Sequence, residues 1–492
     1  MKLWIRIIAA AVLSGIVIMG LLLVRSRAGW TGPASNVDLS TLDMSGHHRL
    51  LIVAPHCDDE TLACGGLTLA AKHAGLDVHV MIVTNGDGFY FATMEQFHNI
   101  FPKRSDYVKM GELRQKESLS ALSLLGVPNE EVTFLGYPDR GTPILLNDHW
   151  SDKDPFTSPY DHADRSPYPA TYDHNAVYAG EDLLADMKSV LASYKPDLVV
   201  YPHPADAHPD HWGAGVFTRL AIEVLEHEDP TFKPDTYVYL VHKKNFPKPA
   251  GLQPKNGILP PKGFERITSH WLKLDLTDQD VISKWQAVSE YRSQLPLLRN
   301  LMESFIRRNE LFGEITTPDL PYLAQGLHSD PSTWRTDEGK PVEPVQYGQT
   351  DGFVASRSAT KSANIVSLYA SRDGSNMLNL AADLRGRPNN GLTYTIRVLA
   401  ILPKGEKQYV VRVGRKVKDS HQASANANYI CDRVSMSELG NPWLVMVRAE
   451  SAAPGGMILG STPWQILRVV PSKAGLYRRN LALGVPSQSS RL

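Results

Sequence analysis

The chain has 492 residues, of which 42% are hydrophobic and 21% charged, so it is long enough for two or three domains with sizeable cores. Lys and Arg (51) nearly balance Asp and Glu (52), and the formal net charge of −1 leaves no overall field that would attract nucleic acid. The three cysteines are too few for a disulfide framework and form no paired-cysteine zinc motif.

The N-terminus contains a candidate membrane segment. An unbroken apolar run covers residues 7–24, with basic residues on both sides of it. A helix of this length spans about 27 Å, close to the ~30 Å hydrocarbon core of a bilayer. The alternative is a cleaved signal peptide, whose apolar region is normally about 7–15 residues and ends at a small-x-small site. We expect residues 1–28 to be an uncleaved signal-anchor helix, followed by a linker over 29–47 and an extracytoplasmic catalytic part.

Residues 48–328 show strands alternating with helices. Apolar runs typical of buried strands are followed by stretches with helical spacing, and the order is β-α-β-α. This alternation predicts an α/β fold with a Rossmann-like, mostly parallel sheet and helices on both faces. Functional sites of such sheets form at the carboxyl ends of the strands. The segment 141–180, rich in Pro, Asp and Tyr, is unusually long for a connector and is of the kind that covers an active site or is disordered.

The C-terminal third has a different pattern. Residues 329–352 have the composition of a linker. Residues 353–475 contain short apolar runs separated by Gly, Pro and Asn turns, which predicts an all-β, sandwich-like domain. A tail follows over 476–492.

Two groups of metal-binding residue types come directly after predicted strands. His56 and Asp59 stand three residues apart after the run 49–54, and the run 196–202 is followed by a second group. Two His and one carboxylate with an open position is the pattern of a catalytic zinc site. Either group alone has a structural explanation, since Asp caps helices and His is common in loops. Together they favour a metal site, and the second group offers His203, Asp206, His208, Asp210 and His211.

The two groups form motifs that resemble those of a known family. "PHCDDETLACGG" (55–66) is similar to the P/A-H-P-D-D-E-x-x-x-G-G signature, and "HPADAHPDHWGAG" (203–215) to the H-P-D-H-x-x-x-G signature, of the LmbE-like or PIG-L family of zinc-dependent N-acetylglucosaminyl deacetylases. Further matches occur in the family's order at "TNGDG", "RQKESLSALSLLGV", "FLGYPDRG" and "KWQAVSEYRSQ". The resemblance covers about residues 49–312 and neither the N-terminal run nor the C-terminal domain.

The resemblance implies the ligands and the base of the reaction. His56, Asp59 and His211 would bind Zn²⁺, with water in the fourth position. Asp58 would be the general base, which takes a proton from this water and passes it to the departing amine.

The resemblance also implies groups that contact the substrate. His208 would stabilise the oxyanion, and Asp210 would orient His208 and raise its pKa so that it carries a proton. Arg114 and Asp139 match positions that bind sugar hydroxyls or nearby groups. Their alternative interpretations are a solvated helix residue and an ordinary turn residue. Glu60 is expected to support the start of a helix.

The sequence departs from the family beside the expected metal. Cys57 stands where the family has proline, and it would reach zinc only if the turn differed from the family's. Free cysteines often behave as small buried hydrophobes, which is what we expect of Cys57 and Cys64. The aromatic residues of 141–180 suit stacking on sugar rings, or packing of this segment onto the protein body.

The predicted function is a membrane-anchored, zinc-dependent amidohydrolase that removes an N-acetyl group from an amino sugar or glycoconjugate. One alternative is a zinc amidase of another N-acylated small molecule, and a second is a zinc- or glycan-binding module without turnover. The presence of both Asp58 and His208 argues against the second, since a structural site needs neither a base nor an oxyanion donor. Ligand type alone also admits iron or cobalt.

Overall fold

The computed structural model describes residues 39–264, 268–323, 330–336, 338–347, 359–414, 417–418, 424–426 and 428–470. The predicted signal-anchor segment 1–28 and the tail 476–492 lie outside the described residues. Within those residues, no helix combines the length and the apolar character needed to cross a bilayer.

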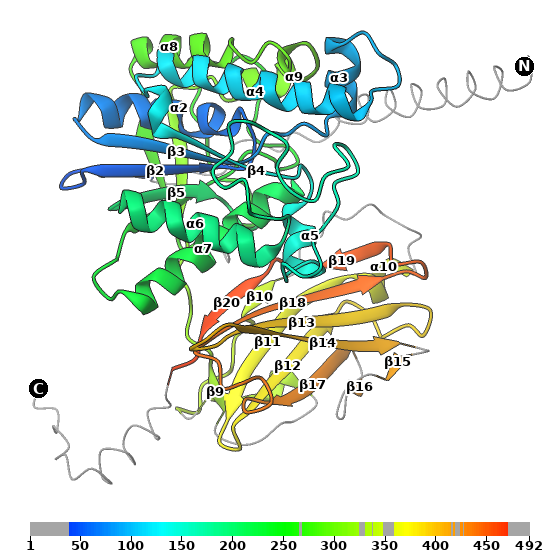
Figure 1. The fold of residues 1–492 in the computed structure, drawn as a ribbon. Helices are drawn as coiled ribbons and strands as arrows, with labels where there is room; N and C mark the ends of the chain where they lie inside the picture. The colour runs from blue at the N-terminus through cyan, green and yellow to red at the C-terminus, as the bar shows by residue number, and fades with distance from the viewer. Residues whose placement is uncertain are drawn as a thin grey trace, which may run out of the picture. The chain divides into compact units, whose positions relative to one another are not determined.

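An eight-stranded sheet forms the centre of the N-terminal part, in the order β1-β7-β8-β6-β5-β2-β3-β4 (Figure 1). The strands from β6 to β4 in this order are all parallel, whereas β8 is antiparallel to both of its neighbours. The prediction of a mostly parallel α/β sheet is therefore confirmed. The strands are β1 (Ser40–Thr41), β2 (Arg49–Ala54), β3 (Asp77–Thr84), β4 (Val132–Tyr137), β5 (Leu198–Pro202), β6 (Asp235–Tyr239), β7 (His270–Asp275) and β8 (Asn309–Glu314).

Helices cover both faces of this sheet, as predicted (Figure 1). Alternate residues of β2 enter separate cores, with Leu50 and Ile52 on one side and Leu51 and Val53 on the other, because successive strand side chains point to opposite faces. Both sides of the strand are buried, which explains its continuous apolar run. One layer contains α2 (Asp59–His73), α3 (Tyr90–Gln96), α4 (Arg104–Leu124), α8 (Asp278–Val288) and α9 (Leu295–Glu303), and the other α5 (Thr142–Asn147), α6 (Gly180–Tyr194) and α7 (Pro209–Glu228).

Two further sheets, each of six strands, form the C-terminal part. Their facing side chains share one hydrophobic core, as expected for the predicted sandwich. The two-residue strand β9 pairs with β11, so this part takes up residues N-terminal to the predicted boundary at 353. The first sheet contains β9 (Tyr322–Leu323), β10 (Gln346–Tyr347), β11 (Ile365–Asp373), β12 (Met377–Leu384), β16 (Ser424–Asn426) and β17 (Tyr429–Ser435); the second contains β13 (Thr393–Ile401), β14 (Glu406–Gly414), β15 (Val417–Lys418), β18 (Leu444–Ala452), β19 (Ile458–Ser461) and β20 (Gln465–Arg468).

The core beside α6 and α7 continues into the second of these sheets. Leu444, Met446 and Ile466 belong to the same group of buried residues as Phe217 of α7. Polar contacts reinforce this core at Asn147, whose Oδ1 accepts a hydrogen bond from Trp464 Nε1 at 3.1 Å. The described residues from 39 to 470 accordingly belong to one compact unit.

The segment 141–180 begins with α5 and then runs across the protein with little regular structure. Trp150 and Tyr168 are buried, and Trp150 stacks on Phe217. The hydroxyl of Tyr168 donates to Asp87 Oδ2 at 2.8 Å. These two aromatic side chains therefore pack the segment onto the body and are not free to stack on a sugar.

Candidate active site

The two sequence motifs meet because β2 and β5 are neighbours in the sheet. α2 begins at Asp59, shortly after β2, and α7 begins at Pro209, shortly after β5. His56 Nδ1 lies 3.1 Å from Asp59 Oδ2, and His211 Nε2 lies 3.0 Å from the same oxygen. The structure thus brings together the three predicted zinc ligands, although they lie far apart in the sequence.

The ligand types of this trio suit a cation. His211 is fully buried, and neither of its ring nitrogens makes a hydrogen bond, even though Nε2 stands only 3.0 Å from the Asp59 carboxylate. A buried imidazole nitrogen without a hydrogen-bond partner is costly unless another group satisfies it. Two imidazoles and one carboxylate are ligands that suit Zn²⁺.

Carboxylates lie behind both candidate ligand histidines. His56 Nε2 faces Asp210 Oδ2 at 3.2 Å and Asp139 Oδ1 at 3.4 Å. His211 Nδ1 faces Asp206 Oδ2 at 3.4 Å. A carboxylate on the far nitrogen of a ligand histidine fixes the orientation of the ring and strengthens it as a donor. Asp139 stands in the turn after β4, as its alternative interpretation had it, and it is also buried against His56.

The predicted pairing of Asp210 with His208 is wrong. The Asp210 carboxylate accepts hydrogen bonds from the Arg140 backbone N–H at 2.6 Å and from Thr142 Oγ1 at 2.8 Å, and it faces His56. Burial, together with the neighbouring histidines, lowers the pKa of His208 to about 2, so Asp210 does not hold it protonated.

His208 instead interacts with the backbone of Asp210. Its Nδ1 accepts a hydrogen bond from the Asp210 N–H at 3.3 Å, as the N-cap of α7. An accepting Nδ1 leaves the proton of a neutral imidazole on Nε2. His208 lines a cavity beside these groups and can therefore serve as a hydrogen-bond donor there without carrying a charge.

Asp58 is buried and held by Arg114. Arg114 Nη2 lies 3.1 Å from Asp58 Oδ2 and also donates to the Cys57 carbonyl at 2.8 Å, while Nη1 donates to the Gly86 carbonyl at 2.6 Å. Burial raises the pKa of Asp58 to about 7, and Arg114 opposes this shift. Arg114 is only 4% exposed, so its alternative interpretation as a solvated helix residue is wrong.

The neighbours of Asp58 behave as expected. Glu60 Oε2 accepts the Asp58 backbone N–H at 3.0 Å, and its Oε1 accepts from Tyr291 at 2.7 Å, which supports the turn into α2. Cys57 and Cys64 are free and fully buried, and burial raises the pKa of both thiols. The interpretation of both as buried hydrophobic residues is confirmed.

A cavity of 280 Å³ opens onto these groups. Its polar wall contains His56, Asp58, Asp59, Arg114, Asp139 and His208. Its other wall is largely apolar, with Phe89, which precedes α3, and Leu298, Leu301 and Met302 from α9. A polar wall opposite an apolar one is typical of a cavity that binds a small organic group in one orientation.

The structure gives a place in the site to two groups to which the sequence assigned no role. His242 follows β6 and lines the cavity, and one of its ring nitrogens lies within 4.8 Å of donor atoms of Asp59 and His211. No motif surrounds His242. Asp206 was a member of the second group of the sequence but was given no role there. Its contact with His211 Nδ1 depends on side-chain orientation, which the spacing of residues along the sequence does not show.

The sequence is similar to those of known proteins. Residues 51–222 match the family model described as PIG-L, GlcNAc-PI de-N-acetylase. A protein of Mycobacterium sp. (strain KMS) named 1D-myo-inositol 2-acetamido-2-deoxy-alpha-D-glucopyranoside deacetylase is 32% identical over 186 residues, which is 37% of this chain and 53% of that protein. A protein of the same name from Corynebacterium urealyticum is 29% identical over 188 residues, with 36% and 48% covered.

The chain thus spans about half the length of the curated relatives it matches. Among solved structures, the N,N'-diacetylchitobiose deacetylase of Pyrococcus horikoshii is 17% identical, with 56% of this chain and 87% of that chain covered and a TM-score of 0.34.

Proposed function

We propose that this chain, which carries a PIG-L-family domain over residues 51–222, is a zinc-dependent hydrolase that removes the acetyl group from an N-acetylated amino sugar. The observation that carries the proposal is the convergence of His56 Nδ1 and His211 Nε2 on Asp59 Oδ2, at 3.1 and 3.0 Å, beside the buried Asp58. This arrangement combines a cation site with a carboxylate suited to act as base.

Each polar group has a defined task in the proposed reaction. Zn²⁺ held by His56, Asp59 and His211 supplies Lewis acidity and lowers the pKa of water towards ~7. Asp58 accepts a proton from the attacking water and later gives it to the departing amine. His208 donates a hydrogen bond to the oxygen that becomes negative as the acetamide carbonyl is attacked.

Arg114 keeps Asp58 in place for this work. Its two nitrogens join the Asp58 carboxylate to the carbonyls of Cys57 and Gly86, so the base has little freedom to rotate. Both Nη atoms of Arg114 make these contacts, whereas its Nε makes no hydrogen bond. Arg114 and Asp139 both line the cavity, and we infer that Arg114 acts mainly by positioning Asp58.

The substrate class follows from the relatives and from the cavity. The matched relatives are named for a substrate in which an N-acetylated glucosamine is joined to inositol. A cavity of 280 Å³ accommodates a group of about the size of one sugar ring, and its apolar wall suits a ring face. We infer that the acetylated sugar occupies this cavity and that the rest of the substrate extends out of it.

The membrane anchor is also part of the proposal. The apolar run 7–24 supports an uncleaved N-terminal helix that holds the catalytic part at a membrane surface, on its extracytoplasmic side. Extraction of the full chain from membranes tests this directly. Release by alkaline carbonate without detergent would contradict the anchor.

The proposed activity is tested by acetate release from a panel of N-acetylated sugars and glycoconjugates. Asp58→Asn keeps the size of the side chain and removes the base, and we expect acetate release to fall by about 10²–10⁴-fold. Asp186→Asn is the matched control, because Asp186 is a buried carboxylate that contacts Tyr137 and not the site.

Zinc content provides a second measurement. His211→Ala is expected to lose zinc, whereas Asp58→Asn is expected to keep it. Equal acetate release by the wild type and Asp58→Asn would contradict the role of the base. Full zinc content in His211→Ala would contradict the ligand set.

A further inference from the structure

The C-terminal sandwich has a cavity of its own, which measures 480 Å³ and is larger than the catalytic one. Four separate parts of the chain form it: β9, the turn between β11 and β12, the loop between β17 and β18, and the segment just after β20. All of its lining residues lie outside residues 51–222, which match the family model. None of them takes part in the proposed reaction.

Backbone hydrogen bonds between the loops fix the walls of this cavity. The Met436 N–H donates to the Asn376 carbonyl at 2.9 Å, and the Asn441 N–H donates to the Met436 carbonyl at 2.7 Å. Asp373, at the start of the first turn, is buried, and its Oδ2 pairs with Arg433 Nη2 at 2.8 Å. The cavity is therefore preformed, and a ligand can bind there without first ordering a loop.

Two half-buried aromatic side chains, Tyr322 and Trp443, stand in the wall of this cavity. The indole of Trp443 stacks on His227 of α7, with ring centroids 3.8 Å apart and planes 5° from parallel. The guanidinium carbon of Arg372 lies 5.5 Å from the centre of the Tyr322 ring. Each ring is thus supported from one side by a neighbour. Fixed, flat apolar surfaces of this kind suit the C–H face of a sugar ring.

Polar side chains without a partner accompany these rings. Asn376 and Asn441 are exposed, and within the described ranges neither their amides nor the Tyr322 hydroxyl makes a hydrogen bond. Both asparagines have positive φ, 58° and 55°, in turns that fix where the amides are attached. Amides and hydroxyls offer donors as well as acceptors. Such groups beside an aromatic surface match a sugar, whose hydroxyls need both kinds of partner.

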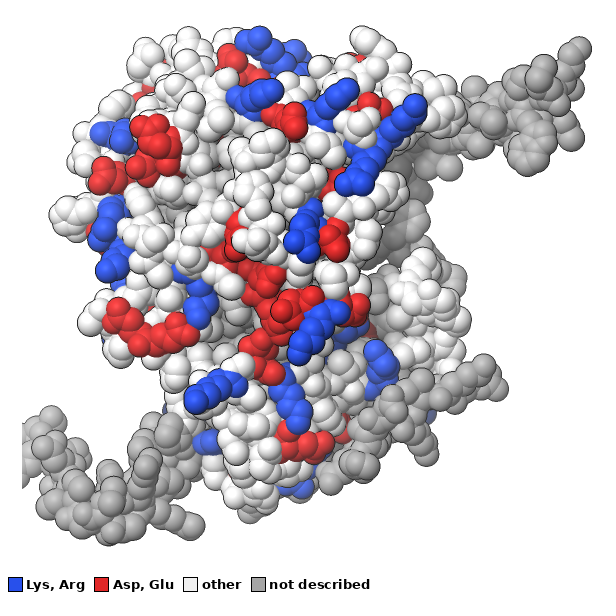
Figure 2. Space-filling model, in the orientation of Figure 1, with Lys and Arg blue, Asp and Glu red and all other residues white. Residues whose placement is uncertain are grey.

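The charges around this cavity favour a neutral ligand. Among its described lining residues, Arg372 and Asp373 are the charged ones, and their charges cancel. Acidic side chains gather over the middle of the face shown in Figure 2, whereas over its lower part, which belongs to the C-terminal sheets, both signs occur without a large area of either. No field therefore draws a polyanion to this part of the protein.

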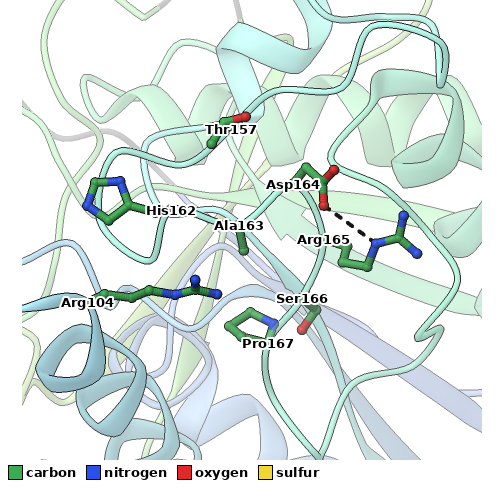
Figure 3. Close-up of a pocket in the computed structure, with 8 residues that line it drawn as sticks. All are labelled: Arg104, Thr157, His162, Ala163, Asp164, Arg165, Ser166 and Pro167. Carbon is green, nitrogen blue, oxygen red and sulfur yellow. Dashed lines mark ion pairs between the residues drawn. The ribbon is translucent and has the colours of Figure 1, made fainter.

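The cavity under the segment 141–180 has a different character (Figure 3). It measures 390 Å³ and lies beside Arg104, the first residue of α4. Asp164 and Arg165 also line it and form an exposed ion pair at 3.5 Å. None of its described lining residues is Trp, Tyr or Phe. It offers no flat apolar face to a sugar, so the combination of rings and unpaired amides distinguishes the cavity of the sandwich.

We propose that the cavity of the C-terminal sandwich binds a neutral sugar ring of a glycan chain. Trp443 and Tyr322 contact the C–H face of the ring, and the amides of Asn376 and Asn441 bind its hydroxyls. The site acts independently of the proposed reaction, because every residue given a role in that reaction lies in the N-terminal part. The C-terminal part thereby keeps the protein on a carbohydrate chain.

Ligand-observed NMR titrations of the full chain test this site. The probes are linear neutral tetramers of glucose, mannose, galactose and N-acetylglucosamine, with the tetramer of galacturonic acid as the charged comparison. We expect at least one neutral tetramer to bind with a dissociation constant of about 1 mM or lower, as a stacked ring and a few hydrogen bonds provide. The acidic tetramer should gain nothing from its charge.

A double variant, Asn376→Gly with Asn441→Gly, identifies the cavity that binds the tetramer. It removes both amides and keeps the turns, since glycine adopts positive φ readily. The loss of two hydrogen bonds to a neutral ligand should weaken binding about tenfold. Asn245→Gly is the matched control, because Asn245 is also exposed, has a φ of 64° and lies outside the sandwich. It should bind the tetramers like the wild type.

The outcomes separate this site from the proposed function. Acetate release from monomeric N-acetylglucosamine should be the same in the wild type and the double variant, and its absence from both would contradict the proposed function alone. The sugar site is overturned if no neutral tetramer binds at about 10 mM, or if the acidic tetramer binds more tightly than every neutral one. Equal binding by the wild type and the double variant overturns it as well.

A second variant keeps the test decisive if the double variant does not fold. Tyr322→Phe retains the ring and removes one unpaired hydroxyl, so it should weaken binding of the same tetramer about fivefold. Unchanged binding by a folded Tyr322→Phe protein would then count against the site.

Discussion

Asp206→Asn should weaken zinc binding without unfolding the protein. Asp206 Oδ2 faces His211 Nδ1 at 3.4 Å and accepts the backbone N–H groups of Val241 and His242 at 3.0 Å each. Its Oδ1 accepts the His208 N–H at 2.8 Å. Burial raises the pKa of Asp206, but His211 and these hydrogen bonds outweigh burial and lower it to about 2, so the group is charged at neutral pH.

The size of the effect follows from these contacts. Asparagine offers only one acceptor oxygen. With this oxygen toward His211, Val241 and His242, only the bond from His208 is lost, at a cost of about 1 kcal/mol to the free energy of unfolding. The negative charge behind His211 is lost as well. Removal of such a carboxylate typically weakens metal binding about 10–100-fold, equivalent to about 1.4–2.7 kcal/mol.

Chelator competition measures this effect on the purified protein. The zinc dissociation constant of Asp206→Asn should rise, and the increase in melting temperature on adding zinc should become smaller, because binding to the folded state stabilises it in proportion to affinity. Asp186→Asn is the control, since its buried partner is Tyr137 and its zinc affinity should not change. A folded Asp206→Asn protein that binds zinc as tightly as the wild type would refute the role given to Asp206.

Three further predictions concern stability and the base. Lys284→Met leaves Glu310 buried without its partner at 2.7 Å and should lower the free energy of unfolding in urea by about 3–5 kcal/mol. The control Lys273→Met, at a partly exposed lysine paired with the exposed Asp275, should change it by less than about 1 kcal/mol, and equal effects of the two variants would contradict this. Burial, with Asp139 and Asp161, raises the pKa of Asp87 to about 8. This group therefore makes the free energy of unfolding fall as pH rises from about 4 to 8, by up to about 1.4 kcal/mol per pH unit. Asp87→Asn should gain stability over the wild type toward pH 8, and a constant difference between the two proteins from pH 5 to 8 in urea unfolding would argue against it. In Arg114→Lys, a single ammonium cannot hold the Asp58 carboxylate and both carbonyls. This variant should lower kcat/KM by about 10²-fold with an unchanged circular dichroism spectrum. Unaltered kinetics would show that the guanidinium is not needed to position Asp58.

The sequence was a good guide where burial dictates composition. The strands β2 and β5 are covered on both faces, so their residues are uniformly apolar and easily recognised. The short strand β9 has only two residues, too few to show any periodicity, and although it lies within the predicted catalytic part it pairs with β11 of the C-terminal part. Predictions for the N-terminal anchor stay predictions, because residues 1–38 lie outside the described part of the chain.

The candidate site was predicted in its members but not in all of its contacts. Their positions after strand ends marked His56 and Asp59 and the group from His203 to His211, because neighbouring parallel strands end at one edge. The family resemblance then singled out His211 within that group. The partner of Asp210 could not be predicted in this way. Whether a carboxylate faces His208 or His56 depends on how α7 and the turn at Arg140 are oriented, and this orientation arises only in the folded chain.

The core shared by α7 and the C-terminal sheets has a consequence for how this protein can evolve. A gene that ended near codon 328 would encode every residue of the catalytic cavity, yet it would leave the face of α7 around Phe217 without Leu444, Met446 and Ile466. Such a chain would expose an apolar surface that favours aggregation. Recombination cannot exchange the catalytic part alone without replacing this face, so the two parts are expected to be gained and lost together.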